Sequence, residues 1–213
     1  MKRPFGPLTY TSAECAEESE AFAATASGGE RLDALVDAAV YWTDAGSCAR
    51  ALALLDEVAA ARTGGLAAED DPGLDRMLAL YAFTLHTAGR GEEARDAFTA
   101  AEAYARGSGD WYAFEDLADH LAGAGQDERA VRHWTTALDL LLPEAADPPA
   151  GRDHGAQEHG GWDHAARERA VHRIRAERRG ARARLGLPSD AHDLAPSPGP
   201  RRGLFDRLLR RGS

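Results

Sequence analysis

The sequence predicts an all-α fold whose main part consists of three consecutive antiparallel helical hairpins. Ala and Leu, which favour helices, are abundant, whereas Val and Ile, which favour strands, are scarce. Apolar residues recur every three or four positions in segments separated by glycine-containing breaks, which is typical of helices that bury one face. The chain has 213 residues, of which 44% are hydrophobic, so it can form one domain with its own core and additional tails.

Residues 1–29 are expected to form an N-terminal arm and a short helix. Two prolines and a glycine near the start are typical of an irregular segment, and Ser12 can then cap a polar helix that continues to about Thr25. We expect Phe22 to attach this helix to the body of the protein and the helix itself to cover the first hairpin.

Residues 30–142 contain the three hairpins, which share one register when they are aligned on their central glycines. An alanine follows each glycine after five residues, and a large apolar residue follows that alanine after four more. A second alanine lies twelve residues before the first one. A Val or Ala lies seven residues after the first one. In chain order the aligned sets are Gly46, Ala51, Leu55, Ala39 and Val58; Gly89, Ala94, Phe98, Ala82 and Ala101; and Gly125, Ala130, Trp134, Ala118 and Ala137. Small side chains let two helices cross closely, and the large residue one turn later fills the space beside them.

This register resembles that of the tetratricopeptide repeat family over roughly residues 31–142. The departures are an Ala where the family has its first small Gly, and spacings of 43 and 36 residues between units against a family period of about 34. The resemblance implies a right-handed superhelix of antiparallel hairpins, a solenoid with capping helices at its ends. It also implies that the first helix of each unit lines a concave groove.

The resemblance points to nine groove positions: Val36, Val40, Thr43, Ala79, Phe83, His86, Tyr112, Glu115 and Asp119. We take Val40, Phe83, His86, Tyr112, Glu115 and Asp119 as the candidate partner-binding residues. A cationic amphipathic helix or peptide would suit them, with Phe83 and Tyr112 as apolar anchors and Glu115 and Asp119 as charge partners. The alternative is that the two aromatic side chains pack between helices and the two acids lie on a solvated face.

The C-terminal third differs in charge from the rest of the chain. Residues 151–213 contain 14 Arg and 8 acidic residues, whereas the first 150 residues contain 11 basic and 27 acidic residues, which argues against nucleic acid as the main partner. We expect residues 143–162 to form a loop, residues 163–187 an Arg-rich helix that caps the last hairpin, and residues 188–213 a flexible linker with a short basic tail.

The tail combines arginines with the apolar residues Leu204, Phe205, Leu208 and Leu209. Three hypotheses stay open for it. It could dock on the acidic groove of its own chain, it could bind a partner or an anionic membrane surface, or it could only increase solubility.

Residue patterns that support catalysis or metal binding do not appear in the sequence. His154, His159 and His164 recur every five residues, a spacing that suits neither one helical face nor the common zinc motifs. We find no phosphate-binding Gly loop and no nucleophile elbow, and we expect neither a cofactor nor an enzyme.

The expected location is the bacterial cytoplasm. Only two cysteines are present, the N-terminus lacks a signal-peptide pattern, and the almost exclusive use of Arg over Lys suggests a GC-rich genome. The sequence therefore predicts a protein–protein interaction scaffold or adaptor that binds a protein or peptide. The alternative is a peripheral membrane-associated or nucleic-acid-associated protein that uses its Arg-rich C-terminal region.

Overall fold

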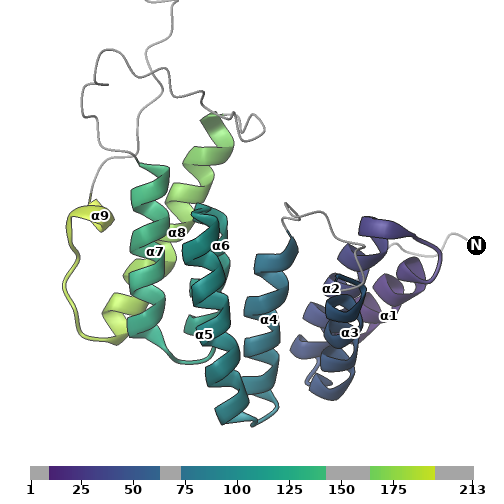
Figure 1. The fold of residues 1–213 in the computed structure, drawn as a ribbon. Coiled ribbons are helices and arrows are strands. Elements are labelled where there is room, and N and C mark those ends of the chain that lie inside the picture. Colours follow the sequence, from purple (N-terminus) through teal and green to yellow (C-terminus); the bar gives the residue numbers. More distant parts are fainter. Residues whose placement is uncertain (1–9, 63–72, 143–163, 195–213) are drawn as a thin grey trace, which may run out of the picture. The chain divides into compact units, whose positions relative to one another are not determined.

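The computed structural model describes residues 10–62, 73–142 and 164–194, and these residues form nine helices without a strand (Figure 1). The predicted all-α fold class is therefore confirmed for this part of the chain. The chain divides into two compact units, Met1–Ser108 and Gly109–Ser213.

The first unit contains five helices: α1 (Ser12–Ala23), α2 (Gly28–Asp44), α3 (Cys48–Ala61), α4 (Gly73–Thr87) and α5 (Gly91–Ser108). α1 packs on α2, α2 pairs with α3, and α4 pairs with α5, while α2 and α4 also lie side by side. The Thr43 and Thr84 hydroxyls meet at 2.9 Å between α2 and α4, and both are buried. This contact joins the first helices of the first two hairpins.

The helix expected after the N-terminal arm begins at Ser12, but its N-cap is Thr11. The Thr11 hydroxyl accepts a hydrogen bond from the Glu14 amide at 3.2 Å, and the Glu14 carboxylate accepts one from the Thr11 amide at 2.7 Å. This reciprocal capping box explains why the helix starts at Ser12, one residue earlier than a Ser12 cap would allow. The expected anchoring by Phe22 is wrong, because its side chain is 56% exposed and Ala16 and Ala23 form the buried side of α1 instead.

The second unit contains α6 (Trp111–Gly123), α7 (Asp127–Leu141), α8 (His164–Arg184) and α9 (Ala191–Leu194). α6 pairs with α7, and α8 packs mainly on α7 and also touches α6. The predicted Arg-rich helix is thus present as α8. Its buried apolar residues are Ala170, Val171, Ile174 and Ala181.

The residues of the repeated register are buried in all three hairpins. The twelve positions other than the glycines are at most 4% exposed: Ala39, Ala51, Leu55, Val58, Ala82, Ala94, Phe98, Ala101, Ala118, Ala130, Trp134 and Ala137. The small and large residues therefore form the helix–helix contacts for which their spacing is suited.

The three hairpin turns have the same backbone geometry. Gly46, Gly89 and Gly125 have φ of 76°, 76° and 71°, a left-handed conformation that glycine adopts without steric cost. In each turn the amide after the glycine donates to the carbonyl five residues earlier, over 2.8 Å, 2.9 Å and 2.8 Å respectively. These Schellman-type bonds end the first helix of each hairpin at the same point of the register.

A fourth turn of this kind follows α8. Gly186 has φ of 69°, the Leu187 amide donates to the Arg182 carbonyl at 2.9 Å, and Ala191 again stands five residues after the glycine. α8 and α9 therefore correspond to the first helix and the beginning of the second helix of a further hairpin. The structure differs here from the expected linker over residues 188–213, because α9 forms between Pro188 and Pro196.

Candidate partner-binding site

Three of the six predicted binding residues, Tyr112, Glu115 and Asp119, lie together on α6 where it meets α8. They line two open hollows that share Asp119, one of about 150 Å³ and one of about 460 Å³. We call this region the α6–α8 site. It consists of Tyr112, Glu115, Asp116, Asp119, Ala122 and Gly123 from α6, Trp134 from α7, and Arg173, Glu177 and Arg184 from α8.

Glu115 is bound to α8 rather than open to solvent. Its residue is 2% exposed, and the Arg173 guanidinium donates from Nε to Oε1 and from Nη2 to Oε2, both at 2.8 Å. Burial raises the pKa of Glu115, while the hydrogen bonds and charge of Arg173 oppose that rise. The charge partner that we expected Glu115 to find in another molecule is thus supplied, in this structure, by the chain's own Arg-rich helix.

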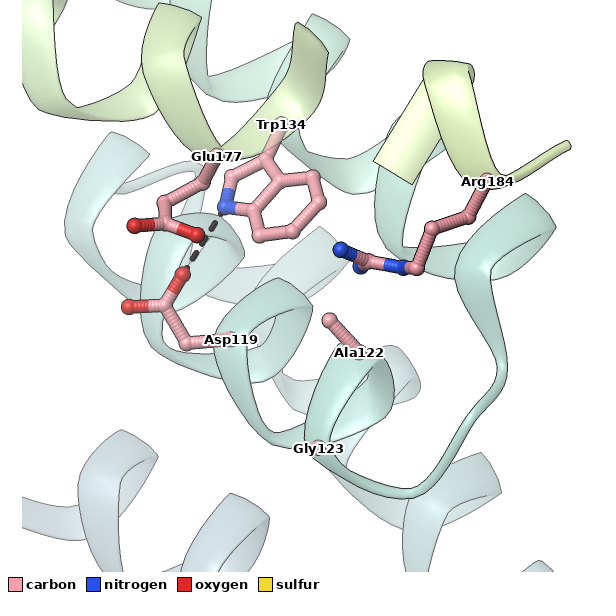
Figure 2. Close-up of a pocket in the computed structure, with 6 residues that line it drawn as sticks. All are labelled: Asp119, Ala122, Gly123, Trp134, Glu177 and Arg184. Atoms are coloured by element: carbon pink, nitrogen blue, oxygen red, sulfur yellow. Dashed lines mark hydrogen bonds between the residues drawn. The ribbon is translucent and has the colours of Figure 1, made fainter. Parts of the chain in front are cut away.

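Asp119 lies in the larger hollow beside Trp134 and Glu177 (Figure 2). The buried Trp134 indole donates from Nε1 to Asp119 Oδ1 at 2.9 Å, which fixes the orientation of the carboxylate. Partial shielding from water raises the pKa of Asp119 most strongly, and the neighbouring Asp116 raises it further, although the Trp134 hydrogen bond opposes the shift. Figure 2 shows the Asp119 and Glu177 carboxylates near the nitrogen edge of the indole, with Arg184 beyond its other side.

The cations around this hollow leave its carboxylates free for a ligand. Arg184 donates to Asp127 over 2.8 Å and 2.6 Å, so its guanidinium is already paired with another carboxylate. Among the described residues, neither Asp119 nor Glu177 has a cationic partner within ion-pair distance. Ala122 and Gly123 line the hollow without large side chains. Two carboxylates in an open hollow are suited to bind a cationic group without covalent chemistry.

The other three predicted residues, Val40, Phe83 and His86, lie in the first unit. Val40 on α2 is half-buried and packs against the core of that unit, and Phe83 on α4 is also half-buried. His86 is exposed in the last turn of α4. The six residues are therefore divided between the two units, three in each.

No group of three or more His, Cys, Asp or Glu side chains in residues 10–62, 73–142 and 164–194 is arranged to hold a metal ion. Over the same ranges, no helix has the length and apolar character needed to cross a membrane. His154, His159 and the apolar tail residues Leu204, Phe205, Leu208 and Leu209 lie outside the described residues.

Arg173, Glu177 and Trp134 line the site but are not among the binding residues predicted from the sequence. Trp134 was assigned only to the register, and the two α8 residues stand among many other charged positions. The signal that could have found Arg173 is charge complementarity, because a cationic helix that follows α7 in the chain would naturally pack beside the acids of α6.

No protein-family model, no curated protein and no solved structure matches this chain. The resemblance to the tetratricopeptide repeat therefore stays a prediction from the register of small and large residues.

Proposed function

We propose that this protein is a tetratricopeptide-like adaptor of the cytoplasm that binds a cationic segment of a protein or peptide partner at the α6–α8 site. The contact between Arg173 and Glu115 carries the proposal, because it is an intramolecular example of the recognition that we infer for the partner. The free cysteines Cys15 and Cys48 suit a reducing compartment.

The Arg173 contact occupies only part of the acidic surface of α6. Asp119 and Glu177 keep their negative charges available beside it, in a hollow of about 460 Å³ that has room for a Lys or Arg side chain. The Trp134 N–H holds the Asp119 carboxylate in place, so less conformational entropy is lost when a cation binds. We infer that a partner places one cationic side chain between Asp119 and Glu177 and an apolar side chain near the half-buried Tyr112.

The alternative, binding of α8 to an anionic membrane or to nucleic acid, is less well supported. Six of the eight α8 arginines donate hydrogen bonds to the chain itself: Arg167, Arg173, Arg178, Arg179, Arg182 and Arg184. Arg173 and Arg184 are exposed, but each is paired with a carboxylate of the chain, so its charge is already partly neutralised. The basic tail lies outside the described residues, so membrane binding by the tail stays a separate hypothesis.

A charge-reversal experiment tests the proposal. The probe is a fluorescein-labelled amphipathic peptide of Lys and Leu, and its affinity is measured by fluorescence anisotropy at low and at physiological salt. We expect Asp119→Lys combined with Glu177→Lys to weaken binding by about tenfold or more, because two attractive contacts become repulsive.

Glu92→Lys on α5 combined with Glu128→Lys on α7 is the matched control. Both residues are exposed and lie outside the α6–α8 site, so this variant changes the net charge by the same amount as the Asp119 and Glu177 variant without changing the hollow. Equal loss of affinity in the control and in the Asp119 and Glu177 variant would show that binding follows net charge alone, and the proposed site would be rejected.

A further inference from the structure

Arg175 is a buried arginine at a position where the three complete hairpins have a large apolar residue. It stands eleven residues before Gly186, just as Leu35, Leu78 and Phe114 stand eleven residues before the glycines of their own turns. Arg175 is only 4% exposed. The fold of α8 therefore encloses a positive charge at a position of the hydrophobic core.

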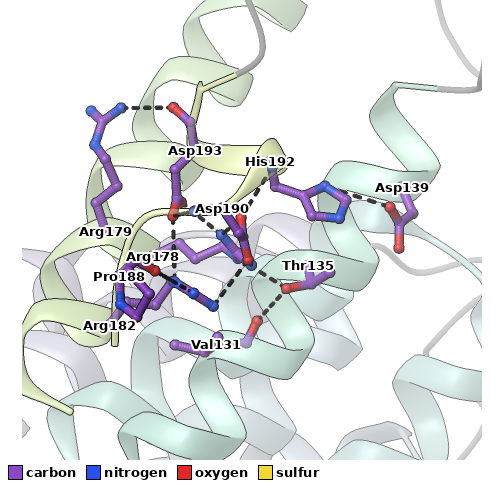
Figure 3. A network of polar contacts seen from close by, with 10 residues as sticks. All are labelled: Val131, Thr135, Asp139, Arg178, Arg179, Arg182, Pro188, Asp190, His192 and Asp193. Atoms are coloured by element: carbon purple, nitrogen blue, oxygen red, sulfur yellow. Dashed lines mark hydrogen bonds and ion pairs between the residues drawn. The ribbon is translucent and has the colours of Figure 1, made fainter. Parts of the chain in front are cut away.

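Asp193, whose charge acts on Arg175, and the neighbouring Asp190 are already engaged with other arginines (Figure 3). Arg178 donates to both oxygens of Asp190, at 2.8 Å and 2.6 Å, and to Asp193 Oδ1 at 2.6 Å. The second oxygen of Asp193 accepts a hydrogen bond from the Asp190 amide at 3.1 Å and lies 3.4 Å from Arg182 Nε. The carboxylates that α9 and its preceding turn bring to α8 are thus bound by Arg178 and Arg182.

Arg175 itself is left without a hydrogen-bond acceptor at the buried side of its guanidinium. Its Nε atom is enclosed and makes no hydrogen bond, and no ion pair joins Arg175 to the described residues. Burial is the main cause that lowers the pKa of Arg175, and the positive charge of Arg179 lowers it further. Arg179, four residues later on α8, is exposed and donates only to the backbone carbonyl of Asp193, at 3.3 Å.

The balance of charge at this corner is positive. Arg178 and Arg182 pair with the carboxylates of Asp190 and Asp193. Arg179 donates only to the Asp193 backbone, and Arg175 pairs with neither carboxylate although the charges of Arg179 and Asp193 act on it. An enclosed charge without a partner is destabilising, and an unsatisfied buried polar group can mark the place of an ion or ligand. A Leu or Met at position 175 would fill the same core position without this cost.

We propose that the corner between α8 and α9 is an oxyanion site, in which Arg175 donates from Nε and Arg179 supplies a second guanidinium to a phosphate or carboxylate group. Two neighbouring guanidinium groups favour phosphate, which presents several acceptor oxygens and up to two negative charges. The site is opposite in charge to the α6–α8 site, and it does not depend on the cationic partner proposed above.

Thermal unfolding of the full chain tests this site in sodium phosphate and in sodium acetate, each against sodium chloride of equal ionic strength. We expect phosphate to raise the Tm of the wild-type protein more than chloride does, with a smaller increase in acetate. Arg175→Met should lose this response, and its Tm in chloride should equal or exceed that of the wild type, because a buried unpaired charge has been removed. Arg169→Met, which changes an exposed arginine of the same helix, should respond as the wild type does.

A second measurement does not depend on the folding of the Arg175 variant. Phosphate is titrated into the ¹⁵N-labelled wild-type protein while the arginine Nε–H resonances are followed by NMR. We expect one resonance to shift on saturation, and Arg179→Met, a change at an exposed position, to raise the apparent Kd by about tenfold. If no Nε–H resonance shifts in the wild type, or if Arg175→Met responds to phosphate like the wild type, the oxyanion site is rejected.

Discussion

Replacing Arg173 by Met should weaken the attachment of α8 to α6. The side chain of Glu115 is only 3% exposed, whereas that of Arg173 is 59% exposed, so the substitution leaves a buried carboxylate without its cation. Removing one partner of a fully buried pair costs about 3–5 kcal/mol. Because Arg173 is largely solvated and Glu115 can take up a proton, we expect a smaller loss in the free energy of unfolding, about 2 kcal/mol.

Urea unfolding followed by circular dichroism measures this loss, and hydrogen exchange of residues 164–184 shows whether α8 is the element that loosens. Arg169→Met, one turn earlier on an exposed position, is the control and should change stability by less than about 0.5 kcal/mol. The double variant Arg173→Met with Glu115→Leu should recover most of the loss, because it leaves no buried charge. A loss below about 0.5 kcal/mol for Arg173→Met, or no change in the exchange of α8, would refute a stabilising role for the pair.

Three further predictions concern the turns and the other polar contacts. Gly125→Ala should destabilise the protein by about 1 kcal/mol in urea unfolding, because a non-glycine residue is strained at φ of 71°; Gly123→Ala, within α6, is the control. Thr84→Val should cost about 1 kcal/mol by leaving Thr43 without its side-chain partner, whereas Thr43→Val combined with Thr84→Val should cost less than the single change. The Arg178 hydrogen bonds hold the pKa of Asp190 below its usual range, so their stabilisation is present above the ordinary aspartate pKa and is lost as the pH falls below it; Asp190→Asn should therefore show a smaller difference in Tm between pH 6 and pH 3 than the wild type.

The helices and their pairing could be predicted from the sequence because both depend on local spacing. Gly46, Gly89 and Gly125 end helices through their own backbone freedom, and the alanines that follow them need only a neighbouring helix to become buried. The fourth turn at Gly186 carries the same signal, including Ala191 five residues later. It was missed because α8 has arginines at the positions that should have been apolar.

The site was predicted less completely because it depends on which long-range partners the fold brings together. Tyr112, Glu115 and Asp119 share one face of α6, which helical spacing reveals, but the sequence does not show that Arg173, 58 residues after Glu115, takes one of the two acids. The burial of Glu115 follows from that pairing and not from its own residue type. The charge pattern predicts a cationic ligand, and the packing of α8 shows which carboxylates have no cationic partner within the chain.

The arginines of α8 explain why the last hairpin differs from the three before it. Counted from the turn glycine, Arg175, Arg178 and Arg182 stand where the first hairpin has Leu35, Ala38 and Trp42. An apolar second helix packed on these guanidinium groups would leave them buried without acceptors. The resulting loss of hydration free energy would exceed the stabilisation from the apolar contact. The segment after Gly186 instead brings two carboxylates, Asp190 and Asp193, and these satisfy Arg178 and Arg182. Arg175 receives no carboxylate from this segment, and its Nε stays without an acceptor. Arginines at apolar positions of the register therefore account both for the acidic segment that forms α9 and for the unpaired cation on which the oxyanion site depends.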